Sequence, residues 1–221
     1  MIRARDGSSL TDLAATQLVE HYLTDHSAIV DMFDRTNVGP PRDEIEQIDV
    51  FAPSVLNAYY QPANAMSSLW NRRRLVEPFI VGITKDDFSS ILQSGQLDAV
   101  RATVVQLLTF VNDSRNVPYF GGSGTCTAKF CHRLRPNVVP IWDHWVGTCY
   151  DGPRQAWDTF VRDVYADVAA NLDALIRLQA NVEAKIGLKL SVLRIWDVIL
   201  WTSSGDRCAS FTCPAWVPPG P

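Results

Sequence analysis

The chain has 221 residues, 47% of them hydrophobic and 20% charged, with a formal net charge of −4 and a pI near 5.5. This is the composition of a globular protein long enough for one large core or two smaller ones. The first ten residues lack the apolar run of a signal peptide, and no stretch has the length that crosses a bilayer. We therefore expect a cytoplasmic protein without a membrane partner. The acidic total does not favour nucleic-acid binding, although a local basic face is compatible with it.

Helical signals follow one another along the chain. Ser9 or Thr11 can cap the first helix, whose apolar residues recur at helical spacing. Pro53 is expected to split or kink the second helix, because it lacks the amide that a helix interior needs. Thr84 is expected to cap a later helix, and Gly187 to end one long helix or two stacked ones. The expected helical segments are 9–27, 40–60, 63–80, 84–94, 96–113, 125–135, 142–150, 152–186 and 188–204.

Strand signals are missing from the sequence. No run alternates polar and apolar residues between hairpin turns, and no internal repeat is present. The sequence therefore predicts an all-α fold, a helical bundle of two packed lobes within a single domain that spans residues 1–221. Residues 206–221 are rich in proline and are expected to form an irregular tail.

The five cysteines do not form a recognisable metal site or disulfide framework. Their number is odd and none is part of a CxxC pair, so most are expected to be buried thiols in a reducing compartment. Cys208 and Cys213 have no His or Cys pair nearby in the sequence that would complete a tetrahedral site. We therefore expect no bound metal.

The stretch YFGGSGTCTAKF, residues 119–130, interrupts the helical pattern sharply. Pro118 and the glycine-rich residues 121–124 cannot continue a helix, so one helix ends there and the next begins near Thr125. Glycines at 122 and 124 permit positive φ and a close backbone approach. The arrangement expected here is helix, tight glycine turn, helix.

The start of the second helix is a candidate anion site. Free amides at Gly124, Thr125 and Cys126 would meet the positive end of the helix dipole, where a phosphate is favoured. Three basic residues follow shortly after, Lys129, Arg133 and Arg135. The alternative is a turn that only connects two helices and binds nothing.

Asp143 stands in the segment NVVPIWDHWVGTCY, which is typical of a proline-led entry into another helix. One interpretation is that Asp143 only caps this helix, a role that aspartate performs well. The other is that its carboxylate faces a cleft and reaches a substrate from a rigid scaffold. Both interpretations predict the same local backbone.

Residues 119–147 resemble the helix-hairpin-helix (HhH-GPD-type) DNA glycosylase superfamily. Its members carry a hairpin of the form L-P-G-h-G-x-x-T-A, followed by an aspartate in a segment like P-h-h-D-x-x-V. In FGGSGTCTA, four residues fall on the hairpin pattern, and in PIWDHWV, Asp143 falls on the catalytic aspartate. Gly121 and Ser123 depart from the pattern, which has a proline and an apolar residue there. The four matching hairpin residues are Gly122, Gly124, Thr127 and Ala128.

The resemblance implies a helix-hairpin-helix at about residues 108–135 and a catalytic-aspartate segment at 140–147. Together with the helix LSVLRIWDVILW, the stretch is also similar to an uncharacterised bacterial family remotely related to these glycosylases. The implied DNA partner would contact the hairpin through a phosphate, with a bridging monovalent cation as the one conceivable cofactor. The hairpin residues expected to bind nucleic acid are Gly122, Gly124, Thr125, Cys126 and Lys129.

The resemblance also implies a reaction. The Asp143 carboxylate would stabilise positive charge on the sugar while the bond to a damaged or modified base breaks. A flipped base needs an aromatic pocket. Members that also cut the strand carry a nucleophilic lysine where this chain has Cys126, and Lys129 lies one turn away, so a monofunctional enzyme is implied. The candidates for the base pocket are Tyr119, Trp142, His144 and Trp145.

Three classes of function therefore remain open. The first is a monofunctional DNA-glycosylase-like N-glycosidase. The second is a non-catalytic helix-hairpin-helix module that binds nucleic acid. The third is a hydrolase of free nucleosides or nucleotides that uses the same carboxylate, which agrees better with the acidic net charge.

Overall fold

The computed structural model describes residues 1–3, 8–35, 41–56, 62–150 and 156–203. The expected tail at 206–221, with Cys208 and Cys213, lies outside the described residues, as does the start of the helix expected at 152–186. The described part is mainly helical, which confirms the all-α prediction. Its strands are the short antiparallel pair β1 (Ile2–Arg3) and β2 (Ser9–Leu10). The division into two lobes stays a prediction.

The helices follow closely the order expected from the sequence. Before the glycine turn they are α1 (Asp12–Asp25), α2 (Ser27–Ile29), the π-helical turn η1 (Val30–Asp34), α3 (Gln47–Val55), α4 (Pro62–Val81), α5 (Phe88–Gln93) and α6 (Leu97–Asn112). After it they are α7 (Gly124–Leu134), α8 (His144–Thr148), α9 (Trp157–Ala170), α10 (Leu172–Ile186) and α11 (Val192–Ser203).

Capping residues set several of these boundaries. Thr11 caps α1, because its side chain accepts the Ala14 N–H at 3.1 Å. The expectation for Thr84 is wrong: Asp87 caps α5, since its Oδ1 accepts the Ser90 N–H at 2.9 Å. Pro53 lies within α3, which ends two residues later instead of being split.

The long segment near the C-terminus forms two helices rather than one. It breaks at Asn171 into α9 and α10. Gly187 ends α10, as the sequence predicted, and its backbone is in the left-handed conformation with φ +66°.

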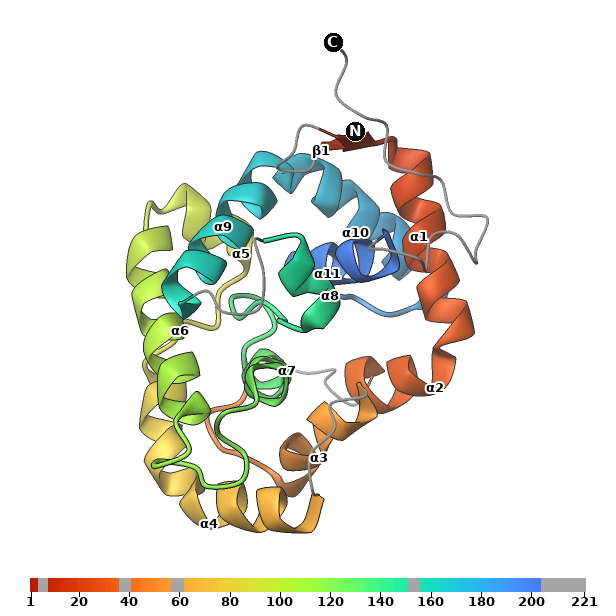
Figure 1. The fold of residues 1–221 in the computed structure, drawn as a ribbon. Coiled ribbons are helices and arrows are strands. Elements are labelled where there is room, and N and C mark those ends of the chain that lie inside the picture. Colours follow the sequence, from red (N-terminus) through yellow and green to blue (C-terminus); the bar gives the residue numbers. More distant parts are fainter. Residues whose placement is uncertain (4–7, 36–40, 57–61, 151–155, 204–221) are drawn as a thin grey trace.

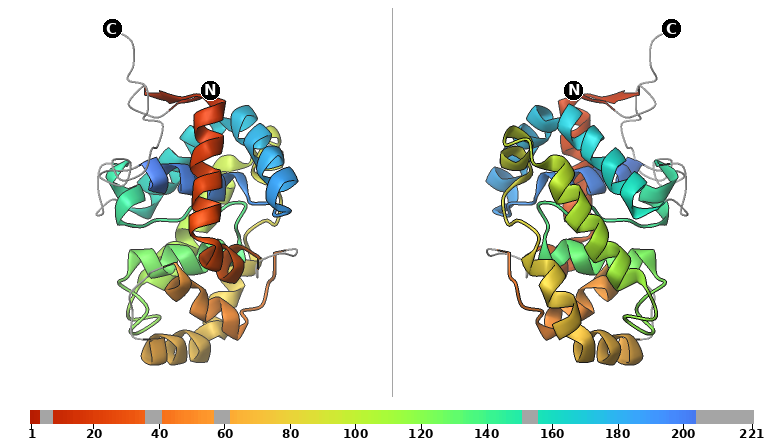
Figure 2. Two further views of the ribbon diagram at one scale, coloured as in Figure 1. Left: turned by 90° about the vertical axis from the view of Figure 1, so that its right-hand side faces the viewer. Right: turned by 90° about the vertical axis from the view of Figure 1, so that its left-hand side faces the viewer.

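Helix α7 lies in the middle of the molecule and is seen end-on in Figure 1. It packs against α3 and α6, while α8 packs against α11, and α11 packs against α1 and α10. Figure 2 shows the molecule from its two sides, with α1 in front in the left-hand view and α6 in front in the right-hand view. This arrangement brings the start of α7, the start of α8, the end of α1 and one face of α11 to a common region.

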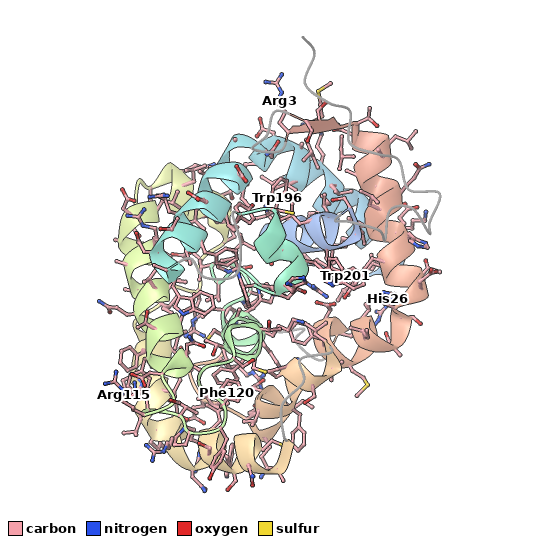
Figure 3. The ribbon with its side chains drawn as sticks, in the orientation of Figure 1. Arg3, His26, Arg115, Phe120, Trp196 and Trp201 are labelled. Carbon is pink, nitrogen blue, oxygen red and sulfur yellow. The ribbon has the colours of Figure 1, made fainter. Side chains whose placement is uncertain are left out.

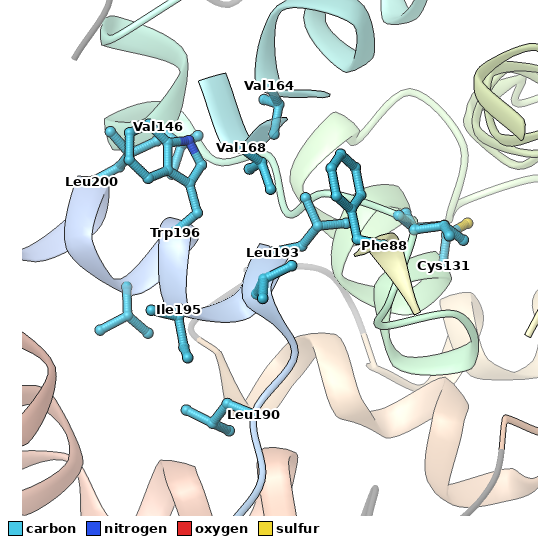
Figure 4. Close-up of a cluster of buried hydrophobic side chains, with 14 of the residues drawn as sticks. Phe88, Cys131, Val146, Val164, Val168, Leu190, Leu193, Ile195, Trp196 and Leu200 are labelled. Atoms are coloured by element: carbon cyan, nitrogen blue, oxygen red, sulfur yellow. The ribbon is translucent and has the colours of Figure 1, made fainter. Parts of the chain in front are cut away.

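Helix α11 is the most completely buried element of the described chain. Every residue from 192 to 200 is buried, including the charged Arg194 and Asp197. Figure 4 shows Trp196 of α11 among apolar side chains from α8, such as Val146. The Trp196 Nε1–H donates to the Tyr150 hydroxyl at 2.7 Å, so its one polar atom is satisfied. An apolar helix of this kind holds any polar group on it in a fixed place.

Candidate active site

Two amides of the glycine turn and the start of α7 donate hydrogen bonds to groups within the hairpin. Gly122 has φ +86°, as its position predicted, and its N–H donates to the Asn112 carbonyl at 2.6 Å. Ser123 caps α7, because its Oγ accepts the Cys126 N–H at 3.4 Å. The Cys126 amide was expected to be free for an anion and Gly122 was expected to bind nucleic acid, but both amides are used within the protein, so these two expectations are wrong. Gly124 and Thr125, the first two residues of α7, are what remains of the expected anion site.

Gly124 is required by a neighbouring tryptophan. A Cβ atom at Gly124 would lie 3.2 Å from two ring carbons of Trp142, and one at Gly147 would lie 3.2 Å from the Trp142 indole nitrogen. Trp142 also makes an edge-to-face contact with Trp157, with ring centroids 6.4 Å apart. Trp142 is thus a spacer between α7 and α8 and is not part of the cavity described below, which corrects its assignment to a base pocket.

A cavity of about 460 Å³ opens where α1, α7, α8 and α11 meet. Figure 3 shows His26, from the end of α1, and Trp201, from α11, directed toward each other beside it. Their ring centroids are 5.3 Å apart in an edge-to-face contact, and Tyr22 contacts Trp201 in the same manner. The residues that line the cavity include Tyr22, Lys129, Asp143, Trp145, Arg194 and Asp197.

Asp143 both caps a helix and lines this cavity. Its Oδ1 accepts the N–H groups of Trp145 and Val146, each at 2.9 Å, at the start of α8. Its side chain is 11% exposed, and Oδ2 lies 3.9 Å from the Lys129 ammonium. The two interpretations of Asp143 are therefore not alternatives: capping through one oxygen fixes the direction of the other. A carboxylate held this way is suited to stabilising a nearby positive charge.

Lys129 is not a surface residue of the hairpin. Its side chain is 6% exposed, and its ammonium donates to the Leu56 carbonyl at 2.6 Å. Burial lowers the pKa of Lys129, and the charges of Asp143 and Asp197 oppose this shift. Lys129 was expected among the residues that bind nucleic acid, but its buried ammonium is not exposed to a DNA backbone. Thr125, one turn earlier on the same helix face, also lines the cavity.

The other basic residues of α7 are likewise engaged in the interior. Arg133 is buried with its Nε donating to Asp49 at 2.8 Å, and Arg135 is buried with an Nη donating to Asp43 at 2.6 Å. On the hairpin itself, Arg115 projects outward (Figure 3) and pairs with Asp113 at 2.5 Å. Arg133 and Arg135 thus join the end of α7 to distant segments through carboxylates, whereas the Arg115 side chain is 88% exposed and pairs with a residue two positions away.

The remaining predicted residues divide between the cavity and other positions. His144 and Trp145 line the cavity, with ring centroids 5.3 Å apart. Tyr119 does not line it: this residue is 72% exposed on the hairpin, with φ +64°. Cys126 is fully buried, and burial raises the pKa of its thiol, which removes the thiolate that nucleophilic attack would need.

The sequence reasoning missed an ion network on α11. The Arg194 guanidinium donates to both carboxyl oxygens of Asp34, at 2.9 and 3.1 Å, and to the Tyr22 hydroxyl at 2.7 Å. It also donates to Asp197 Oδ2. Asp197 Oδ1 is buried and has no hydrogen-bond partner among the described residues. The signal was present as RIWD, an arginine and an aspartate three apart in an otherwise apolar helix.

Within the residues that the structure describes, no three His, Cys, Asp or Glu side chains are grouped so as to hold a metal ion. In the same part of the chain, no helix is both long and apolar enough to span a membrane.

Comparison with known proteins identifies a family but no activity. A family model described as a family of unknown function, DUF6308, matches residues 15–204, so the chain belongs to that family. No curated protein and no solved structure matches the chain significantly.

Proposed function

We propose that this member of the DUF6308 family is a DNA-glycosylase-like N-glycosidase, monofunctional, which removes a damaged or modified base. The observation that carries the proposal is the Asp143 carboxylate, fixed by two helix amides and directed into a cavity with aromatic walls. The resemblance of residues 119–147 to the helix-hairpin-helix glycosylases supports the same assignment.

The chemistry needs a fixed negative charge beside the sugar. When an N-glycosidic bond breaks, positive charge develops on C1′ and its ring oxygen. A preorganised carboxylate in a site that excludes water stabilises that charge more than it stabilises the substrate. Asp143 Oδ1 is held by the Trp145 and Val146 amides, which leaves Oδ2 to face the sugar and to receive a proton from the attacking water.

The size and lining of the cavity suit a base with its sugar. Its volume of about 460 Å³ is within the range of small-molecule sites, roughly 300–1,000 Å³. Tyr22, Trp145 and Trp201 offer aromatic surface for a base taken out of the stack. Lys129, 3.9 Å from Asp143, would face the sugar from the side of α7.

A second candidate is hydrolysis of a free nucleoside or nucleotide by the same carboxylate. The burial of Arg133 and Arg135, each paired with a carboxylate, favours it, because arginines that hold the fold contribute little to a DNA backbone site. The net charge of −4 acts in the same direction.

The testing experiment measures base release from a panel of damaged and modified duplexes and from the matching free nucleosides. The proposal expects release from at least one duplex, and loss of that release in Asp143→Asn. Release from nucleosides alone would favour the second candidate. Salt-dependent binding of duplex without release from any substrate would leave only a non-catalytic binding module.

The proposal that the enzyme releases the base without cutting the strand has a separate test. With a buried Cys126 and a Lys129 ammonium bound to a carbonyl and near a carboxylate, we expect borohydride to trap no covalent adduct during turnover. An adduct that Lys129→Met abolishes would show that Lys129 is a nucleophile and that the enzyme is bifunctional.

A further inference from the structure

Three aromatic rings form one wall of the cavity, and one of them can carry a proton. Tyr22, His26 and Trp201 all line the cavity and contact one another edge to face, with ring centroids 5.1 to 5.6 Å apart. They come from α1, its C-terminal cap and α11, whereas Asp143 comes from the start of α8. A base taken out of its stack needs aromatic surface. With the sugar beside Asp143, as the proposed function requires, the base therefore lies toward this aromatic wall.

His26 is held in place while its ring nitrogens stay unused. Its half-buried ring lies against Tyr22 and Trp201, at 5.1 and 5.3 Å between centroids, and Figure 3 shows it beside Trp201. Within the residues that the structure describes, only its backbone forms hydrogen bonds: its N–H donates to the Tyr22 carbonyl at 3.0 Å, and its carbonyl accepts the Val30 N–H at 2.9 Å. The imidazole nitrogens are therefore available to a ligand in the cavity.

The neighbouring groups are less suited to giving a proton to a base. The Arg194 guanidinium stays charged and donates to two carboxylates and to the Tyr22 hydroxyl. Burial raises the pKa of Tyr22, which makes its hydroxyl a weaker acid, and the unpaired oxygen of Asp197 is buried. His144 also lines the cavity, but it is exposed at the start of α8, on the side of the sugar. Among the described residues that line the cavity, His26 is the group best placed to give a proton to the base.

We propose that His26 is the general acid of the site, and that its substrates are N-glycosides of an uncharged base with a basic ring nitrogen, such as a purine. This inference rests on the proposed function and adds to it the class of leaving group. An uncharged base leaves poorly as an anion, because the electron pair of the broken bond stays on its nitrogen. A proton delivered to the ring neutralises it, and imidazole is the side chain that most readily exchanges a proton near neutral pH.

The protonated His26 ring takes part in the step in which the base leaves. The C1′–N bond breaks and its electron pair stays on the base, while a proton moves from the imidazolium of His26 to a ring nitrogen of the base. A water oxygen bonds to C1′ and passes one proton to the Asp143 carboxylate. Solvent then carries a proton from Asp143 back to His26, so the net reaction is base release by addition of one water. Asp143 acts on the sugar and His26 acts on the base.

A purely structural role for His26 predicts a different result. If His26 only packs against Tyr22 and Trp201, its loss should affect every substrate alike, because packing does not depend on the leaving group. If it protonates the base, its loss should spare a base that already carries a positive charge. The choice of leaving group therefore separates the two roles.

The experiment compares wild type, His26→Gln and His21→Gln on two kinds of substrate. One kind carries adenine, guanine or hypoxanthine, and the other carries 7-methylguanine, whose ring is already positively charged and which leaves as a neutral base without protonation. Each is supplied within a duplex and as the free nucleoside. His21→Gln is the matched control, because His21 is a histidine of the same helix that lies 3.3 Å from Asp25 and is not among the residues that line the cavity.

We expect His26→Gln to lower release of the uncharged purines by about 100-fold or more and release of 7-methylguanine by less than about 3-fold. His21→Gln should change neither by more than about 2-fold. Equal losses in His26→Gln, or no loss, would overturn the inference. So would a wild type that releases 7-methylguanine or a pyrimidine but none of the uncharged purines, which would still leave the proposed function standing. A wild type that releases no base from any duplex or nucleoside would overturn both.

Two further variants keep the inference testable. If His26→Gln does not fold, His26→Phe retains an aromatic ring beside Tyr22 and Trp201 but has no proton to give, so it should show the same selective loss. His144→Gln examines the other imidazole that lines the cavity. A loss confined to uncharged purines in His144→Gln, with none in the His26 variants, would assign the acid to His144 and contradict the inference.

Discussion

Two aspartates of this protein each cap the start of a helix, but in different surroundings. Asp87 caps α5 and Asp143 caps α8, and each accepts a backbone N–H at 2.9 Å. Asp87 does so on the surface, whereas Asp143 is buried on a cavity wall beside a lysine. A capping role for an aspartate therefore neither indicates nor excludes a catalytic role for the same residue. What distinguishes the two residues is where the second carboxyl oxygen lies.

The largest expected difference between the two caps is in activity. Asp143→Asn should lower base release by about 100- to 1,000-fold, because it removes the charge that stabilises the sugar cation. Asp87→Asn removes a cap of the same type and should change release by less than about 2-fold. Initial rates under single-turnover conditions check this. Similar losses in both variants would mean that only stability had been measured.

The second largest effect is expected on stability, when the contact of Gly124 with Trp142 next to the Asp143 cap is changed. A Cβ at Gly124 would lie 3.2 Å from the Trp142 ring, so Gly124→Ala should push this ring away from α7. We expect the protein to be destabilised by about 1–3 kcal/mol. Gly82→Ala is the matched control, since its nearest neighbour atom would lie at 3.5 Å, an ordinary contact. Urea denaturation measures both. Equal stability of the two variants would show that Trp142 does not hold the Asp143 cap in place.

A smaller effect is expected on stability when the caps themselves are changed. Asparagine caps helices nearly as well as aspartate, so Asp143→Asn and Asp87→Asn should each cost about 1 kcal/mol or less. Thermal unfolding of the two variants checks this. A much larger loss of stability in Asp143→Asn would mean that the Asp143 charge is needed for folding. A lower activity of this variant would then not be evidence for a catalytic role.

The smallest expected effect is the acid response of the surface cap. The Ser89 hydroxyl and the Ser90 N–H lower the pKa of Asp87 below 3.8. Its contribution to stability is therefore present above about pH 4 and is lost as the pH falls through the lowered pKa. The difference in Tm between wild type and Asp87→Asn should shrink between pH 5 and pH 2. A difference that stays constant to pH 2 would show that the ionised form contributes nothing.

Local signals in the sequence predicted much of this fold. The glycine run, the stop at Pro136 and the restart after Pro140 placed α7 within one residue at each end and located Asp143 as a cap. These features depend on backbone conformation and hydrogen bonds within a few residues. Gly122 has the positive φ that this reasoning allowed, whereas Gly124, for which it was also allowed, is an ordinary residue of the first turn of α7.

The site could be predicted only in part, because most of it depends on contacts between distant segments. Trp142 was assigned to a pocket, yet its place is set by Gly124 on one side and Gly147 on the other. Burial of Lys129 depends on α3, whose end supplies the Leu56 carbonyl. Asp197 could have been singled out as an acid in an apolar helix, but its relation to Asp143 required the packing of α11 on α8.

Binding of a cationic sugar mimic tests the central claim most directly, because it needs no knowledge of the base. The probe is a pyrrolidine whose ammonium nitrogen replaces C1′, and calorimetry measures its Kd. If Asp143 stabilises positive charge in the cavity, wild type and Asp87→Asn should bind the probe equally, and Asp143→Asn should bind it at least about 10-fold more weakly. Equal binding by Asp143→Asn, or no binding by wild type, would contradict the account.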